Sequence, residues 1–351
     1  MNVPKTLKRA FRHRWFIPLL LVFLVLGFFW RIGLFNPLRP AETVRELGGR
    51  AVDVLTGGGG FSFDENTPGY ENYKQLMQGC PIKDCIPSID DPQFESAKEA
   101  SAWLEDEDVV FALDYKGEQR AYPQRILNWH EIVNDVVAGD PVAITFCPLC
   151  GSALTFDRKV DGQVLEFGIS GKLHNNDLIM YDRKTDEKPA ESLWQQITGE
   201  AIVGELFGKR LRQIPMDTLR WGEWRGLHPK TTVLSRNTGF SRDYGRYPYG
   251  DYEQSSSLLF PVEGGVDTTL HPKAVVFGVE VNGRFTAYPE DVLQADADGV
   301  ISDSLGGVRL RITYNQGTVT VENLATGDEI VTTRLFWFAW KAFHSDTELY
   351  Q

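Results

Sequence analysis

VVFALDYKGEQRAYPQRIL, at residues 109–127, returns as VVFGVEVNGRFTAYPEDVL at residues 275–293. The offset is a constant 166 residues with no gap, and eight of the 19 positions are identical. Each stretch is typical of a β-hairpin that turns at a glycine, Gly117 or Gly283, and ends in a Tyr-Pro pair from which a helix starts. A weaker match continues from Ile144 and Ile312 onward. The repeat predicts two related β-rich units.

The rest of the pattern also favours strands. Short β-rich runs separated by Gly, Asn and Asp turns lie at residues 109–115, 142–146, 153–156, 164–170 and 178–182. Helices are expected only near residues 91–104, 123–134 and 217–226. The predicted fold class is α+β, predominantly β, with two diverged β-rich repeat units after an N-terminal transmembrane helix. The first unit spans residues 80–262, and the second, smaller and degenerate, spans 263–351.

The charge of the chain is divided unevenly. It carries 36 basic and 48 acidic residues, but residues 1–35 hold six basic residues and no acid, which leaves −18 on residues 36–351. A body this acidic repels phosphate backbones, so nucleic acid is excluded as a partner.

The N-terminal residues predict a membrane anchor. FIPLLLVFLVLGFFW at 16–30 has no charge and follows a basic cluster. The predictions are a cytoplasmic tail (1–14), a transmembrane helix (15–35) and a tether (36–79). The chain is then a single-pass protein of the inner or plasma membrane, and most of it is extracytoplasmic. A cleaved signal peptide is the alternative, but no small-residue cleavage site follows the apolar run.

The two copies differ where the first carries chemically active residues. Asn-Trp-His-Glu at 128–131 is replaced by Gln-Ala-Asp-Ala at 294–297, and Cys-Pro-Leu-Cys-Gly at 147–151 by Asn-Gln-Gly at 315–317. Their joint loss suggests one site built from His130, Cys147 and Cys150, with Trp129 shielding it. Helical spacing of Ile126, Trp129, His130 and Val133 would turn His130 inward and Glu131 elsewhere.

Three interpretations of Cys147 and Cys150 compete. In the first, the two cysteines form a thiol–disulfide couple in which His130 stabilises one thiolate. The protein would then be a thiol oxidoreductase that exchanges electrons with a redox donor or another envelope protein. As a metal site, the two sulfurs would bind copper or zinc together with His130, His174 and Met180. The third interpretation is a structural disulfide.

Two other features allow further hypotheses. Cys80 and Cys85 are expected to form a local disulfide, and a four-sulfur zinc site with the other cysteine pair is the alternative. The Tyr- and Arg-rich stretch 241–252 is either a binding loop or a structural loop held by tyrosine hydroxyls. If it is a binding loop, the protein could be a non-catalytic envelope interaction module.

Five motifs together resemble the domain-of-unknown-function 3179 (DUF3179) family of bacterial and archaeal proteins. They are Asp-Cys-Ile-Pro-Ser-Ile-Asp at 84–90, Asn-Trp-His-Glu-Ile-Val-Asn-Asp at 128–135, Phe-Cys-Pro-Leu-Cys-Gly at 146–151, Leu-Ile-Met-Tyr-Asp-Arg at 178–183 and Thr-Gly-Phe-Ser-Arg-Asp-Tyr at 238–244. The resemblance runs from about Cys80 to the C-terminus and implies no catalytic residue. Members described as selenoproteins imply a redox role for Cys147 and Cys150. The family usually has glycines at the positions of Cys80 and Cys85, which implies that this chain has gained a disulfide there.

Overall fold

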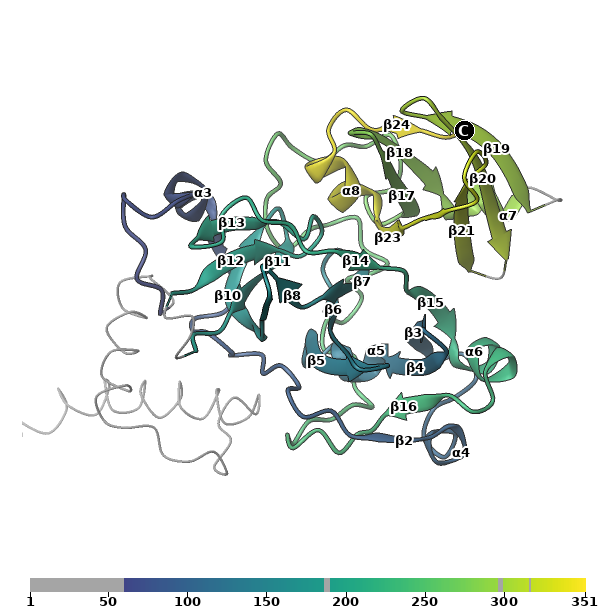
Figure 1. Ribbon diagram of the computed structural model, residues 1–351, viewed down its shortest axis with the longest axis horizontal. Helices are drawn as coiled ribbons and strands as arrows, with labels where there is room; N and C mark the ends of the chain where they lie inside the picture. The colour runs from purple at the N-terminus through teal and green to yellow at the C-terminus, as the bar shows by residue number, and fades with distance from the viewer. Residues whose placement is uncertain (1–59, 186–189, 296–298, 316) are drawn as a thin grey trace, which may run out of the picture.

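The computed structural model describes residues 60–185, 190–295, 299–315 and 317–351 (Figure 1). The predicted cytoplasmic tail and transmembrane helix, and the tether up to residue 59, lie outside the described residues. Within the described part, no helix is long and apolar enough to cross a bilayer. Strands in several sheets are the commonest regular structure in that part, which confirms the predicted β-rich class.

The hairpin at residues 109–127 lies within the predicted first unit. It forms β3 (Val109–Tyr115) and β4 (Glu118–Pro123) in a sheet of order β15-β3-β4-β16-β2. The outer strands are β2 (Phe94–Ser96), β15 (Asp217–Arg220) and β16 (Thr232–Leu234). A second sheet, of order β14-β7-β6-β5, contains β5 (Ile132–Val137), β6 (Asp140–Cys147), β7 (Ser152–Asp157) and β14 (Gln213–Ile214).

The hairpin at residues 275–293 has equivalent neighbours. It forms β17 (Val275–Val281) and β18 (Arg284–Pro289), in a sheet of order β23-β17-β18-β24 with β23 (Thr332–Phe336) and β24 (Glu348–Leu349). β24 pairs in parallel with β18, just as β16 pairs in parallel with β4. The companion sheet, of order β19-β20-β21-β22, contains β19 (Val300–Leu305), β20 (Val308–Asn315), β21 (Thr318–Asn323) and β22 (Glu329–Ile330).

An additional sheet consists of β1 and of four strands that lie between β7 and β14 along the chain, where only residues 324–328 separate β21 from β22. Its order is β1-β10-β11-β12-β13, and a small hairpin precedes it. These elements are β1 (Met77–Gln78), β8 (Lys159–Val160), β9 (Gln163–Val164), β10 (Phe167–His174), β11 (Asp177–Asp182), β12 (Ser192–Gln195) and β13 (Ala201–Gly204), with α3 (Tyr70–Gln75) beside β13. Figure 1 shows this sheet beside the one that contains β6 and β7.

The helices are shorter than the sequence predicts. The helix expected over 123–134 is only α5 (Gln124–Leu127), because the chain turns at Glu131, which has a φ of 56°, and β5 begins at Ile132. The helix expected at 91–104 is reduced to α4 (Ala97–Ala100), which Ser96 and Glu99 cap. The one expected at 217–226 starts as strand β15 and becomes α6 (Trp221–Leu227). In the second unit the helices are α7 (Glu290–Ala295) and α8 (Trp337–Phe343).

α6 and α8 share a pattern that the sequence analysis missed. Each helix begins Trp-x-x-Trp, and a His and a Thr follow at the same spacings. The second indole donates to the threonine hydroxyl in both units, at 3.0 Å from Trp224 to Thr231 and 2.8 Å from Trp340 to Thr347. In both, the histidine ring lies 4.0 Å from that indole. The same local structure therefore follows both β15 and β23.

His344, the histidine of this pattern in the second unit, makes stability depend on pH. Burial lowers its pKa to about 4, and the nearby Glu280 and Arg210 act in opposite directions. The unfolded chain takes up the proton near pH 6.5, so this contribution to stability is complete above pH 6.5 and is lost as the pH falls towards 4. Between pH 7.5 and 5, we expect the wild type to lose about 2 kcal/mol more than His344→Gln, as measured by urea unfolding. The control is His228→Gln, at the half-exposed equivalent position. If the wild type loses only as much stability as His344→Gln over this pH range, the prediction is wrong.

Two of the quoted motifs meet at Arg183. Its guanidinium donates to Asp90 at 2.8 Å and to Ser88 at 2.7 Å, and it also contacts Asp84 and Glu166. The hydroxyl of Tyr181 donates to Asp84 at 2.7 Å. Because a disulfide joins Cys80 and Cys85, the segment before β2 is held both covalently and by this ion network.

Candidate functional site

The Cys-Pro-Leu-Cys-Gly stretch is the turn between β6 and β7. Cys147 ends β6 and pairs with Ser152 at the start of β7, and the backbone N–H of Cys150 donates to the Cys147 carbonyl at 3.2 Å. Gly151 has a φ of 60°, and a Cβ there would lie 2.8 Å from the ring of Phe336. The N–H of Phe336, in β23 of the second unit, donates to the Cys150 carbonyl at 2.8 Å. Phe336 of β23 therefore fixes this turn. The positive φ of residue 151 and the nearby Phe336 ring together require glycine at that position.

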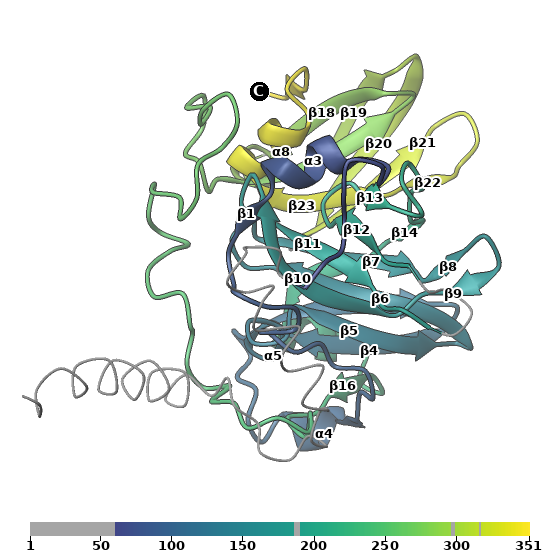
Figure 2. The same ribbon diagram turned by 90° about the vertical axis from the view of Figure 1, so that its left-hand side faces the viewer.

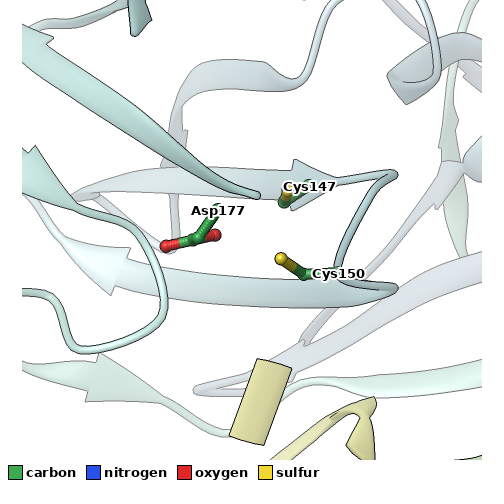
Figure 3. A group of neighbouring side chains, drawn as sticks. All are labelled: Cys147, Cys150 and Asp177. Carbon is green, nitrogen blue, oxygen red and sulfur yellow. The ribbon is translucent and has the colours of Figure 1, made fainter. Parts of the chain in front are cut away.

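Asp177 is the residue that the structure adds to the cysteine pair. Asn175 and Asn176, both with positive φ, form the tight turn from β10 to β11, and Asp177 starts β11. Figure 3 shows Asp177 beside the two cysteines, with one of its carboxylate oxygens on the side of the sulfurs. One oxygen of Asp177 and the two sulfurs all lie within 4.8 Å of one another. Sequence reasoning missed Asp177, and its signal was an acid at the head of a run that is otherwise apolar.

The three residues are removed from solvent. Cys147 is 2% exposed, and Cys150 and Asp177 are 0% exposed. Oδ2 of Asp177 accepts from the Ile197 N–H at 3.0 Å and from Gln195, but Oδ1 has no hydrogen-bond partner among the described residues. A fully buried carboxylate oxygen without a partner is costly, which points to a ligand or a proton at that position.

The site combines two buried carboxyl groups with two buried thiols, and the pKa of each is raised. Burial raises the pKa of Asp177 to about 7 and that of Glu131 to about 8. Burial also raises the pKa of both thiols, and Asp177 raises both further. None of the groups that act most strongly on these four pKa values is a cation. Without a bound cation, the site therefore favours protonated groups near neutral pH.

Glu131 belongs to this environment, and the expectation that it points elsewhere is wrong. The helix ends before it, so helical spacing does not set its direction. Its side chain is buried, accepts a hydrogen bond from the Tyr249 hydroxyl at 3.2 Å and acts electrostatically on Cys147. A second buried acid therefore lies beside the three-residue cluster.

The Protein of unknown function (DUF3179) family model matches residues 83–334. This covers most of the chain and all five of the quoted motifs. The chain belongs to the DUF3179 family. Comparisons with curated proteins and with solved structures find no match. The family description states no activity, so the chemistry of the site is the basis for assigning one.

His130, in a DUF3179 motif, does not join the cysteines in this structure. Its Nδ1 lies 2.7 Å from the Pro87 carbonyl and its Nε2 lies 2.7 Å from the Tyr244 hydroxyl. A carbonyl only accepts, so Nδ1 carries the proton and Nε2 accepts from Tyr244. Burial lowers the pKa of His130 to about 4. Both ring nitrogens are used in holding three DUF3179 motifs together, so neither is available to a metal or a thiolate.

The other predicted ligands also lie outside the cluster. Nδ1 of His174 is 2.9 Å from Oε1 of Gln195, whose amide donates to Asp177, so His174 reaches the cluster only through another side chain. Met180 is fully buried in the core and pairs in register with Trp194. The disulfide between Cys80 and Cys85 leaves those sulfurs unavailable as ligands, which removes the four-sulfur zinc alternative.

The tyrosine-rich loop covers the site. Figure 2 shows the segment between β16 and β17 running along one side of the molecule. Within it, the hydroxyl of Tyr244 binds His130, that of Tyr249 binds Glu131, and that of Tyr252 donates to the Leu149 carbonyl at 3.0 Å. These contacts agree with the structural interpretation of residues 241–252, and they show why the cysteines are buried.

Proposed function

We propose that this DUF3179 protein binds a zinc ion through Cys147, Cys150 and Asp177. The observation that carries the proposal is the convergence of the two sulfurs and one Asp177 oxygen within 4.8 Å of one another at a buried site. The same carboxylate has an oxygen, Oδ1, with no hydrogen-bond partner among the described residues. Thiolate and carboxylate are both ligands of zinc, and three protein ligands leave a fourth position open to water or substrate.

Charge balance supports a cation. Two thiolates and the Asp177 carboxylate would bring three negative charges into a buried site that already contains Glu131. Buried charges are normally paired or bound to metal. A divalent cation would offset most of this charge and deprotonate the thiols on binding.

The ligand set favours zinc over copper. Copper(I) prefers soft sulfur and imidazole ligands, but His130 is fully hydrogen-bonded and Met180 lies in the core. Asp177 supplies a hard oxygen, which suits zinc as a borderline ion. Gln195 and the Ile197 N–H donate to Oδ2 of Asp177, and hydrogen bonds of this kind orient a carboxylate that binds a metal.

Thiol redox chemistry is the second candidate. In its favour, Cys147 and Cys150 are both free thiols with neighbouring sulfurs. Their oxidation to a disulfide would pass two electrons and two protons to a partner disulfide, which would leave as two thiols, and Asp177 could carry one of the protons. Against it, the thiols are buried, and their surroundings raise the thiol pKa instead of lowering it.

Metal analysis and thiol counting on the purified chain separate the two functions. Zinc binding predicts about one zinc ion per chain from zinc-supplemented cells, and two thiols that react with an alkylating reagent only after chelation. Protein from copper-supplemented cells should not hold copper at the same stoichiometry. A metal-free protein with a reversible Cys147–Cys150 disulfide would reject zinc and favour the redox function.

The proposal also covers the origin of the two units, the location of the protein and its partner. The two β-rich units are diverged copies of one ancestor. Three observations support this: the strands correspond in order apart from the additional β2, β16 pairs in parallel with β4 as β24 does with β18, and both units have the Trp–Thr hydrogen bond. The N-terminal apolar run anchors the chain in the inner or plasma membrane, with the body outside the cytoplasm. An envelope protein would be the partner, either as a redox donor or through an interaction surface at residues 241–252.

A further inference from the structure

A chain of hydrogen bonds leads from the surface of the protein to the buried carboxylate of Asp177. It begins at Glu263, whose side chain is 74% exposed and whose backbone N–H donates to Oδ1 of Asn175 at 2.8 Å. Nδ2 of Asn175 lies 3.5 Å from Nε2 of His174, and Nδ1 of His174 lies 2.9 Å from Oε1 of Gln195. The amide of Gln195 then donates to Oδ2 of Asp177. Zinc binding by three ligands does not by itself require the outer part of this chain, which therefore needs a separate explanation.

The two ends of the chain decide which atom donates in each bond. At the outer end, Oδ1 of Asn175 accepts from a backbone N–H, so its Nδ2 is the donor that faces His174. At the inner end, a carboxylate that binds zinc is ionised and only accepts. The nitrogen of the Gln195 amide therefore faces Asp177, and its oxygen faces His174. Both bonds of His174 are satisfied by the neutral tautomer that carries its proton on Nδ1.

His174 selects the orientation of the Gln195 amide. Gln195 is 2% exposed, but its terminal torsion is soft, so burial alone does not choose between the two orientations. The proton on Nδ1 of His174 favours the one in which the nitrogen faces Asp177, because the reverse would place oxygen against oxygen. The ring of His174 packs edge-to-face with that of Phe343 in α8, with 5.5 Å between the ring centres. A helix of the second unit therefore contacts the histidine that orients this amide.

We propose, on the basis of the proposed zinc site, that His174 is a positioning residue that regulates zinc affinity through Gln195. The hydrogen bond from Gln195 stabilises the ionised form of Asp177 and holds its side chain beside the two sulfurs. Without a donor at residue 174, Oε1 of Gln195 would be buried without a partner and the amide would be free to turn. The side chain of His174 is 27% exposed, so a change near the surface can alter the affinity of a buried site that it does not contact.

The zinc affinity of the full chain, measured by competition with a chromophoric chelator, tests the proposal. His174→Leu and Gln195→Met should each weaken zinc binding by about 10-fold or more, as the loss of a residue that orients a metal ligand does. His174→Asn should stay within about 3-fold of the wild type, because the amide nitrogen of asparagine replaces Nδ1 as the donor. The double variant His174→Leu, Gln195→Met should bind zinc no more weakly than Gln195→Met alone, because the histidine acts through the glutamine.

His271→Leu is the matched control, since His271 is exposed and its Nδ1 accepts from the backbone N–H of Lys273. It should leave the zinc affinity unchanged. Wild-type affinity in His174→Leu, no recovery in His174→Asn or full additivity in the double variant would each overturn the positioning role while the zinc site stands. A wild-type chain that binds no zinc would overturn the zinc site and this proposal together. His174 is partly exposed, so the two His174 variants decide the outcome even if Gln195→Met does not fold.

Nitrogen-15 NMR of the imidazole rings in the zinc-loaded chain checks the tautomer separately from the affinity. The signal of His174, identified by its absence from the spectrum of His174→Asn, should show the proton on Nδ1. A proton on Nε2 would mean that His174 does not donate to Gln195, and the proposal would be wrong.

Discussion

Cys150→Ser is expected to abolish zinc retention. The substitution removes one of three ligands and leaves a serine hydroxyl, which does not ionise at neutral pH. We expect the dissociation constant for zinc to rise about 1,000-fold or more, equivalent to about 4 kcal/mol. Elemental analysis of the variant and competition with a chromophoric chelator measure the change.

The same variant should lose the stability that zinc provides. With free zinc at about 1,000 times the dissociation constant, binding stabilises the folded wild type by about 4 kcal/mol. The melting temperature of the wild type should therefore rise with zinc, and that of Cys150→Ser should not. Asp177→Asn keeps the shape of the side chain and removes its charge, so it should weaken zinc binding to an intermediate degree.

A control separates site chemistry from general loss of cysteine. The double variant Cys80→Ser, Cys85→Ser removes the disulfide but no proposed ligand, and we expect it to retain one zinc per chain. Stoichiometric zinc in Cys150→Ser would show that the ion is held elsewhere. Equal zinc loss in the disulfide variant would mean that the fold, and not the ligand set, controls retention.

Arg183→Met is expected to destabilise the fold by about 3–5 kcal/mol, because it leaves acidic groups in partly buried positions without their cation. The side chain of Arg183 is 19% exposed and that of Asp84 is 15% exposed. Burial opposes ionisation of Arg183, but Asp84 and Asp90 raise its pKa above the ordinary value. Methionine keeps the apolar part of the side chain, so the loss of stability reflects the missing charge and not a change in packing.

Urea unfolding of the purified chain measures this effect. Arg311→Met is the comparison, because Arg311 pairs with Glu322 at 3.0 Å on the solvent-exposed face of the second unit. A pair of that kind contributes about 1 kcal/mol at most. If the two variants lose equal stability, the network around Arg183 does not hold the segment at residues 84–90 in place.

Local pattern was sufficient for several features. The hairpins at residues 109–127 and 275–293 follow from alternating β-rich residues around a glycine turn, and the structure forms both. The same argument indicated that Cys147 and Cys150 lie in a turn between two strands, where their side chains meet. These inferences depend only on neighbours along the chain, which a sequence displays directly.

Local pattern failed where a helix stopped early. The argument for His130 assumed helical spacing through residue 134, but the chain leaves the helix after Leu127 and turns at Glu131. That turn reversed the expected roles, because His130 became a hydrogen-bonding link and Glu131 the neighbour of Cys147. Periodicity cannot report such a break when no glycine or proline marks it.

By itself, the sequence determined that the protein is β-rich, that two similar hairpins organise it, and that Cys147 and Cys150 form a pair. The tertiary structure alone brought Asp177 to them, through β11, one of the strands that lie between β7 and β14 along the chain. It also decided that His130 and Met180 lie elsewhere. The physical reason is that strand pairing joins residues far apart in the chain, and neither the partner nor the register is written in local spacing.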